Sequence, residues 1–170
     1  MIFKNRMSVN FTIILSLILL MLTGCLTMLA GPQGQQQRLY SPEAYVKRGN
    51  ENMNRGNYDQ AIDDYSEAIR LNPNYAVAYN NRAWIFACQL KRDFERALDD
   101  ANQALRLSAN NAGYLDTRGW VFLGIGDYEK ATDDFLKALQ LNPNMTEPKE
   151  GLRIIREAQA DEEIDWSEFE

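Results

Sequence analysis

The chain has 170 residues and contains no histidine. This absence excludes the Ser-His and Cys-His pairs of nucleophilic catalysis and every metal site built on imidazole. The sequence also lacks a nucleophile elbow and a glycine-rich phosphate loop. We therefore expect a protein that is not an enzyme and that holds no metal ion or dissociable cofactor.

Cysteine is equally scarce, with only Cys25 and Cys88 in the chain. If Cys25 is modified, as argued below, Cys88 stands alone and no internal disulfide can form. We expect Cys88 to be a small, buried or half-buried residue near the end of a helix rather than a reactive thiol.

No stretch of the chain is strongly basic. The sequence has 18 Lys and Arg against 24 Asp and Glu, a net charge of −6. Residues 159–170 hold six of the acids and no base, so the remainder is balanced at 18 and 18. We therefore do not expect the protein to bind nucleic acid. Residues 160–170 are predicted to be an acidic tail interrupted by Ile164, Trp166 and Phe169. The tail either keeps the protein soluble, or docks as a short motif, or folds back onto the domain.

What the chain does contain is a repeat. Residues 58–74 read YDQAIDDYSEAIRLNPN, residues 94–110 read FERALDDANQALRLSAN, and residues 128–144 read YEKATDDFLKALQLNPN. Tyr58 to Phe94 is 36 residues and Phe94 to Tyr128 is 34. A period of this length is typical of a stack of identical supersecondary units.

Each unit is predicted to be a pair of helices, because apolar residues recur at helical spacing, as in Tyr128, Ala131 and Phe135. Small residues in the first helices are expected to face alanines in the second and let the two approach closely; these are Gly49, Ala83 and Gly119. Short acceptor side chains precede each second helix as predicted N-caps; these are Asn57, Asp93 and Asp127. Pro73 and Pro143 are expected to close second helices.

Paired carboxylates recur in register, at Asp63-Asp64, Asp99-Asp100 and Asp133-Asp134. A catalytic dyad is not expected to appear three times at equivalent positions. We interpret the pairs as solvated faces and polar contacts between turns.

Taken together, these positions resemble the tetratricopeptide repeat family. The resemblance runs from about Pro42 to Met145 and implies an all-α solenoid of helical hairpins. Its predicted parts are repeats at 42–75, 76–111 and 112–145 and a C-terminal capping helix at 146–159. The middle copy departs from the pattern: it has Ala101 in place of an aromatic residue and Ala109 in place of the closing proline. It also has two extra residues near Lys91 and Arg92, which we place in the turn between its helices.

In this family the first helices line an inner surface on which partners bind as extended peptides or helices. The resemblance therefore puts Trp84 and Trp120, at equivalent positions, on a groove. The predicted peptide-binding residues are Asn50, Asn80, Asn81, Trp84, Asp116, Thr117 and Trp120. The alternative is that both indoles pack between adjacent helices as core.

Some family members clamp acidic C-terminal peptides with Lys, Asn and Arg. Asn50 and Asn81 match the asparagine positions, but Val46, Gly113 and Thr117 occupy the basic ones. Chaperone tails are therefore not expected as ligands, and the same absence argues against the acidic tail of this chain lying in the groove.

The N-terminal segment carries two basic residues, Lys4 and Arg6. An apolar run follows at 11–22 and is too short for a membrane span. Leu22-Thr23-Gly24-Cys25 follows and resembles a bacterial lipoprotein signal. The resemblance implies a signal peptide at 1–24, a covalent lipid on Cys25, and a flexible tether at 25–41. Leu26 then favours the periplasmic face of the outer membrane if the organism is Gram-negative. The alternative is a signal anchor with an incidental cysteine.

The sequence thus predicts a lipid-anchored adaptor that binds a protein or peptide partner in a bacterial cell envelope. Two alternatives stay open. One is an assembly or pilot factor for a secretin, a pilus or an outer-membrane complex, and the other is a homo-oligomeric structural protein.

Overall fold

The computed structural model describes residues 41–162 of the chain. The predicted signal peptide, Cys25 and its tether, and the acidic tail from residue 163 lie outside the described residues. No helix between residues 41 and 162 has both the length and the apolar character needed to cross a membrane.

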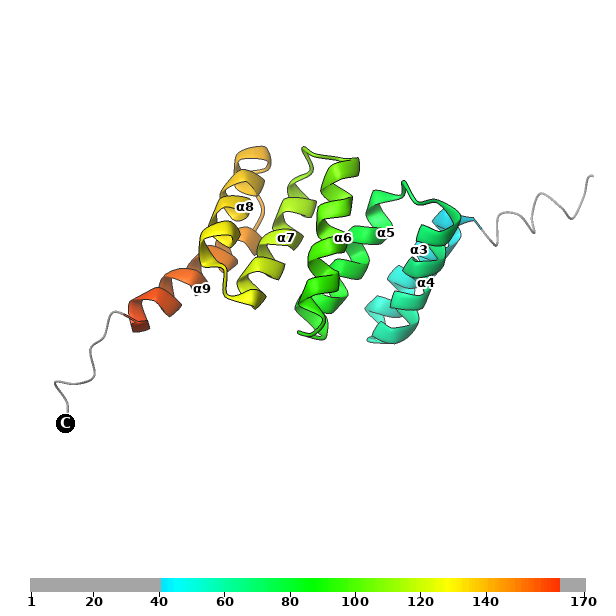
Figure 1. The fold of residues 1–170 in the computed structure, drawn as a ribbon, viewed down its shortest axis with the longest axis horizontal. Coiled ribbons are helices and arrows are strands. Elements are labelled where there is room, and N and C mark those ends of the chain that lie inside the picture. The colour runs from blue at the N-terminus through cyan, green and yellow to red at the C-terminus, as the bar shows by residue number, and fades with distance from the viewer. Residues whose placement is uncertain (1–40, 163–170) are drawn as a thin grey trace, which may run out of the picture. The chain divides into compact units, whose positions relative to one another are not determined.

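Helices account for all the regular structure in the described residues, and the two helices of each repeat form a hairpin (Figure 1). The three hairpins and the last helix are α3 (Pro42–Asn54) with α4 (Tyr58–Leu71), α5 (Ala76–Trp84) and η1 (Ile85–Gln89) with α6 (Phe94–Leu107), α7 (Ala112–Ile125) with α8 (Tyr128–Leu141), and α9 (Glu147–Glu162). The predicted fold class, an all-α solenoid of three hairpins with a capping helix, is confirmed. The capping helix ends at Glu162, three residues later than predicted.

The predicted helix caps are only partly right. Asp127 accepts a hydrogen bond from the backbone N–H of Lys130, as an N-cap should. Asn57 and Asp93 make no such bond, and Asp93 is held in a left-handed conformation with φ of 54°. At Pro73 the turn is closed by the preceding Asn72, whose side chain accepts from the N–H of Asn74 at 3.0 Å.

The closest approach within a hairpin is between a glycine and an aromatic ring. A Cβ on Gly49 would lie 2.6 Å from the Tyr65 ring, and one on Gly119 would lie 2.6 Å from the Phe135 ring. The small residues therefore make room for rings and not, as predicted, for alanines. In the middle repeat, Ala83 replaces the glycine and Ala101 replaces the ring, so the added methyl group has no ring to overlap.

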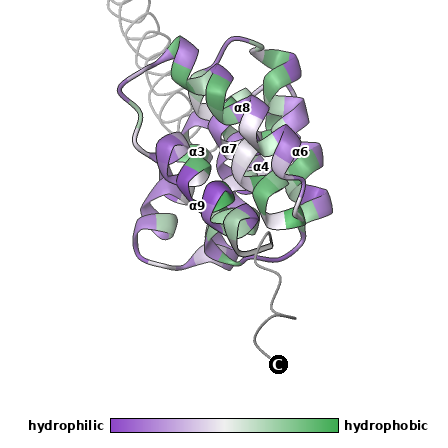
Figure 2. Cartoon of the chain, turned by 90° about the vertical axis from the view of Figure 1, so that its left-hand side faces the viewer, coloured by the Kyte–Doolittle hydropathy of each residue, from purple (hydrophilic) through white to green (hydrophobic). Residues whose placement is uncertain are grey.

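The capping helix uses the same device. A Cβ on Gly151 would lie 2.3 Å from the opposite edge of Phe135, and Ile155 of α9 joins the core around that ring. Glycine in a helix interior costs about 1 kcal/mol relative to alanine, but here it lets α9 close over the last ring. Figure 2 looks at the stack from the α9 end, where hydrophobic and hydrophilic residues alternate around each helix.

The second aspartate of each carboxylate pair is buried, contrary to the prediction of a solvated face. Asp64, Asp100 and Asp134 are at most 7% exposed, while the first aspartate of each pair is exposed. Each buried carboxylate binds an arginine of the first helix in its own repeat. The pairs are Arg48 with Asp64, Arg82 with Asp100 at 2.8 Å, and Arg118 with Asp134 at 2.7 Å.

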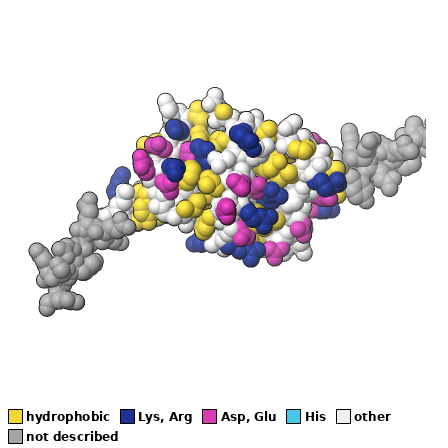
Figure 3. All heavy atoms as spheres, viewed as in Figure 1, with side chains coloured by type: hydrophobic (Ala, Val, Ile, Leu, Met, Phe, Trp, Pro, Cys, Tyr) yellow, Lys and Arg dark blue, Asp and Glu magenta, His cyan; other side chains and the backbone are white. Residues whose placement is uncertain are grey.

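The same arginines also connect consecutive repeats. Arg82 donates to Ser66 Oγ of the preceding hairpin at 2.8 Å, and Arg118 donates to Asn102 Oδ1 at 3.0 Å. A buried carboxylate without its partner would be strongly destabilising. We call the three pairs Arg48–Asp64, Arg82–Asp100 and Arg118–Asp134 the arginine ladder. The ladder fixes the register of each hairpin and its contact with the preceding hairpin. On the face seen in Figure 3, basic and acidic side chains are interspersed.

The two extra residues of the middle repeat disturb the chain earlier than predicted. The last turn of its first helix is a π-helix from Ile85 to Gln89, closed by a bond from Leu90 N to Ile85 O at 2.9 Å. The following turn holds Lys91 in a left-handed conformation with φ of 49°. Such π-bulges are often found at functional sites.

We predict that Gly119→Ala lowers the free energy of unfolding by about 1–3 kcal/mol, because the new methyl group overlaps the Phe135 ring. Urea unfolding followed by circular dichroism measures the change. The double variant Gly119→Ala/Phe135→Ala reproduces the Ala83–Ala101 pair and should lose less than the sum of its two single variants. Stabilisation by Gly119→Ala would contradict the packing argument.

Candidate functional site

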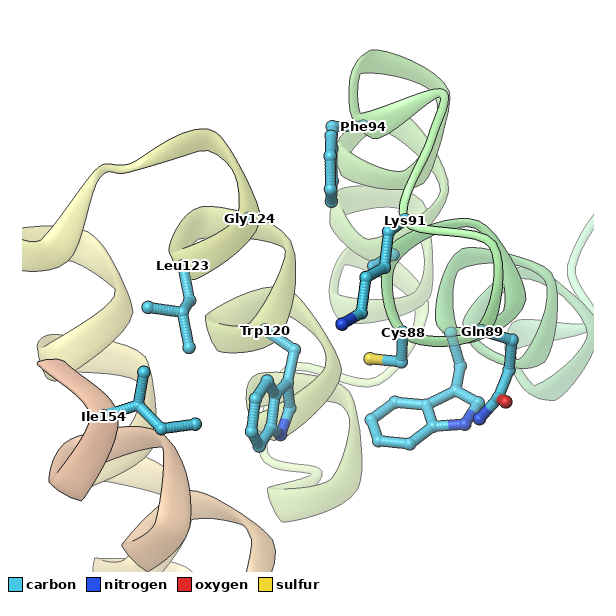
Figure 4. Close-up of a pocket in the computed structure, with 10 residues that line it drawn as sticks. Cys88, Gln89, Lys91, Phe94, Trp120, Leu123, Gly124 and Ile154 are labelled. Atoms are coloured by element: carbon cyan, nitrogen blue, oxygen red, sulfur yellow. The ribbon is translucent and has the colours of Figure 1, made fainter.

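The two tryptophans at equivalent repeat positions line one pocket. Trp84 and Trp120 are half-buried and border a cavity of about 470 Å³ (Figure 4). Leu123 of α7 and Ile154 of α9 complete an apolar wall. Trp120 is also tied to the core, since its ring meets Phe135 edge-on with the centroids 5.6 Å apart. Trp120 therefore both lines the pocket and packs against the core, so the groove prediction and the core alternative each apply to it in part.

The irregular turn of the middle repeat forms the other wall. Cys88 and Lys91 come from the π-helix and the turn after it, and Phe94 comes from the start of α6. Phe94 reaches this place because α7 has a glycine opposite: a Cβ on Gly124 would lie 2.2 Å from the ring. Lys91, at the two-residue insertion, is thus a pocket residue for which the regular repeats have no equivalent, whereas Phe94 takes the place of Tyr58 and Tyr128.

Lys91 brings a positive charge to this apolar site. Its side chain extends into the space beside Trp120 in Figure 4. Among the described residues, no carboxylate or hydrogen-bond acceptor pairs with its ammonium group. Sequence reasoning missed Lys91 as a site residue, although the insertion at this point was the visible sign.

Cys88 is half-buried in the same wall, as predicted. Burial raises the pKa of its thiol to about 12, the negative charge of Asp116 adds to the shift, and Lys91 opposes it. The thiol therefore stays neutral near pH 7 and is a poor nucleophile.

The polar residues predicted for the groove lie outside this pocket. Asn81 donates to Asn50 Oδ1 at 2.9 Å, and the Tyr65 hydroxyl donates to the same oxygen at 2.7 Å. Asn80 is half-buried next to them in sequence, and its Oδ1 has no partner among the described residues. This cluster joins the first two hairpins.

Asp116 and Thr117 are buried, at 6% and 3% exposure, and so differ from the prediction that they present a binding surface. The Thr117 hydroxyl donates to the Gly113 carbonyl one turn earlier at 3.0 Å. Of the seven residues predicted for the groove, the pocket therefore brings together Trp84 and Trp120.

Asp116 is a buried carboxyl group without a cation. Its Oδ1 has no hydrogen-bond partner among the described residues. Burial raises its pKa to about 7, and the charge of Glu147 at the start of α9 contributes; the nearby Trp120 indole N–H acts weakly in the other direction without a well-formed hydrogen bond. We therefore expect this group to make the stability of the fold depend on pH.

Within the described part of the chain, no group of His, Cys, Asp and Glu side chains is arranged to hold a metal ion.

Comparison with known families matches tetratricopeptide repeat models to residues 42–75 and 112–145. These are the first and third hairpins. The middle hairpin, with its π-helix and its alanine pair, lies between the two matches.

Among curated proteins, the chain is similar to the Hsp70-Hsp90 organizing protein of Triticum aestivum, at 33% identity over 123 residues. The match covers 70% of this chain but 21% of the wheat protein, so the chain spans about a fifth of that relative.

The match with two solved structures covers nearly the whole length of each of those structures. The first TPR of Spaghetti (RPAP3), bound to the HSP90 peptide SRMEEVD, is 31% identical with a TM-score of 0.65, covering 70% of this chain and 93% of that one. The first TPR domain of human RPAP3 is 31% identical with a TM-score of 0.66, covering 72% and 94%.

We predict that Asp116→Asn raises the free energy of unfolding by roughly 2 kcal/mol at pH 8 and changes it little at pH 4. The native carboxyl group holds its proton from its ordinary pKa of 3.8 up to about 7, whereas the unfolded chain loses it. The stability of the wild type should therefore fall as pH rises through that window.

Urea unfolding at the two pH values measures this effect, and Asp99→Asn, on an exposed side chain, is the control. A variant that is equally stabilised or destabilised at both pH values would show that Asp116 does not titrate with folding.

Proposed function

Because the chain belongs to the tetratricopeptide repeat family, we propose that it is an adaptor that binds a peptide segment of a protein partner in the Trp84–Trp120 pocket. The observation that carries the proposal is that both half-buried tryptophans border one apolar cavity of about 470 Å³. Tryptophan is one of the residue types that are enriched among the dominant contacts of protein interfaces.

The pocket suits large apolar side chains of a peptide. Its volume lies within the range of roughly 300–1,000 Å³ that is usual for ligand sites. One wall comes from the packed helices α7 and α9, so little ordering of that side of the protein is needed on binding. Peptide complexes of similar domains support this class of ligand: the second TPR domain of human RPAP3, at 26% identity, was solved with the HSP70 peptide SGPTIEEVD.

The details of recognition are proposed to differ from those complexes. The positions at which the clamp of the family would need bases hold Val46, Gly113 and Thr117, and Val46 and Thr117 are buried. No side chain at these positions carries a positive charge for a terminal carboxylate. We therefore favour a partner anchored by large apolar side chains over the acidic C-terminus of a chaperone.

The adaptor is further proposed to be anchored through a lipid on Cys25, in a bacterial envelope. This part of the proposal is supported by the basic start, the short apolar run and the Leu22-Thr23-Gly24-Cys25 sequence. Two or more acyl chains would give a stable anchor. Its effect would be to hold the partner near the membrane face.

We predict that Trp84→Ala/Trp120→Ala abolishes recovery of the principal partner in a crosslinked pull-down from native envelopes, because the pocket loses both aromatic walls. Circular dichroism first establishes that the variant is folded. Leu136→Ala, on a side chain that is 52% exposed on α8, is the matched control and should keep the partner. A partner retained by a folded double variant would exclude the pocket as its site.

We predict that Cys25→Ala removes lipid label from the protein and moves it out of the membrane fraction, because the thiol that would carry the lipid is lost. Metabolic labelling with a fatty acid, followed by fractionation of the envelope, measures both effects. Cys88→Ala is the control, since its thiol is half-buried within the stack. An unchanged label on Cys25→Ala would refute lipidation at this residue.

A further inference from the structure

The lining of the Trp84–Trp120 pocket is mostly apolar but includes one positively charged side chain. Lys91 is the cation that lines the pocket, and no described residue neutralises this side chain. The left-handed backbone at Lys91 and the bond from Arg92 N to Phe86 O, at 3.1 Å, set the turn that carries it. A ligand that fills the cavity and also places a carboxylate beside the ammonium group would satisfy both features of the site.

The end of the chain has this combination three times. In residues 163–170, EIDWSEFE, every apolar residue directly follows an acid: Glu163-Ile164, Asp165-Trp166 and Glu168-Phe169. These residues form the segment that follows the last described one. The basic positions of the family's peptide clamp hold no base in this chain, which argues against binding of an acidic tail by the clamp. Lys91 is a basic residue outside those positions.

The length of the segment allows it to reach the pocket. Ile154 lines the pocket and lies on α9, which ends at Glu162. Eight helical residues separate the two, about 12 Å at 1.5 Å per residue. A tight turn after Glu162 uses about three residues, and four further residues extended by about 3.3 Å each cover about 13 Å by Phe169. Phe169 can therefore return to the level of Ile154.

We infer that residues 163–170 dock into the Trp84–Trp120 pocket of their own chain, with Phe169 in the cavity and a neighbouring acid beside Lys91. The segment then competes with the peptide partner, so this inference rests on the proposed function of the pocket. It makes the adaptor autoinhibited: a partner must bind more tightly than the tail in order to displace it.

A weak contact is sufficient for this role because the tail is tethered. A short flexible connection gives an effective concentration on the order of 1 mM. A free-peptide Kd of about 0.1 mM would then keep roughly nine in ten molecules closed and raise the apparent Kd of a partner about tenfold. A second copy of the chain would need to be present at millimolar concentration to compete with the segment in cis.

The test measures fluorescence anisotropy of a labelled peptide, EIDWSEFE, added to the full chain and to a chain ended at Glu162, both in detergent micelles. The peptide should bind the shortened chain and bind the full chain about tenfold more weakly. The peptide with Phe169→Ala should lose binding. Lys91→Gln in the shortened chain should weaken binding by about tenfold, as expected for losing a contact to a charged group, whereas Lys47→Gln, on the exposed face of α3, should not.

Equal binding to both chains would overturn the inference, since the pocket of the full chain would then be empty. Absence of binding to either chain would also overturn it. A full chain that dimerises, and becomes monomeric when shortened, would assign the tail to a second copy. A partner that depends on Trp84 and Trp120 in the pull-down would uphold the proposed function in each of these cases.

Discussion

The stack depends on one kind of contact, in which an aromatic ring of a second helix occupies the space left by a missing Cβ on the first. Tyr65 against Gly49 and Phe135 against Gly119 set how closely the helices of a hairpin approach. The capping helix is held by the same ring, because Gly151 receives the other edge of Phe135. Close packing of this kind tolerates volume changes only in pairs, and the alanine pair of the middle repeat is such an exchange.

The arginine ladder lies one residue away from this contact on both helices. Arg48, Arg82 and Arg118 directly precede the small residues, while Asp64, Asp100 and Asp134 directly precede the ring positions. Packing that brings a ring onto a glycine therefore also brings an arginine onto a carboxylate. The burial of these charges follows from the apolar contact, and their geometry in turn fixes the register.

The sequence was sufficient to predict an all-α stack of hairpins with a capping helix, because apolar periodicity and small residues recur in three copies. It was not sufficient for the burial of the second aspartates. A polar residue beside an apolar stripe looks solvated until the arginine on the facing helix is considered. The pocket was foreseen only through its two tryptophans, since a π-helix and a left-handed lysine depend on how a two-residue insertion is accommodated in three dimensions.

That insertion separates the chemistry of the site from the stability of the stack. Lys91 lies in the irregular turn, outside both the ring–glycine contacts and the arginine ladder, whereas Phe94 packs its ring on Gly124 of α7. The charge at position 91 can therefore change with little effect on the hairpins on either side. Trp84 ends α5 next to the π-helix, whereas Trp120 also packs on Phe135 and so connects the pocket to the core of the last hairpin and its cap. A side chain bound in the pocket would therefore contact a residue that belongs to the packing around Phe135.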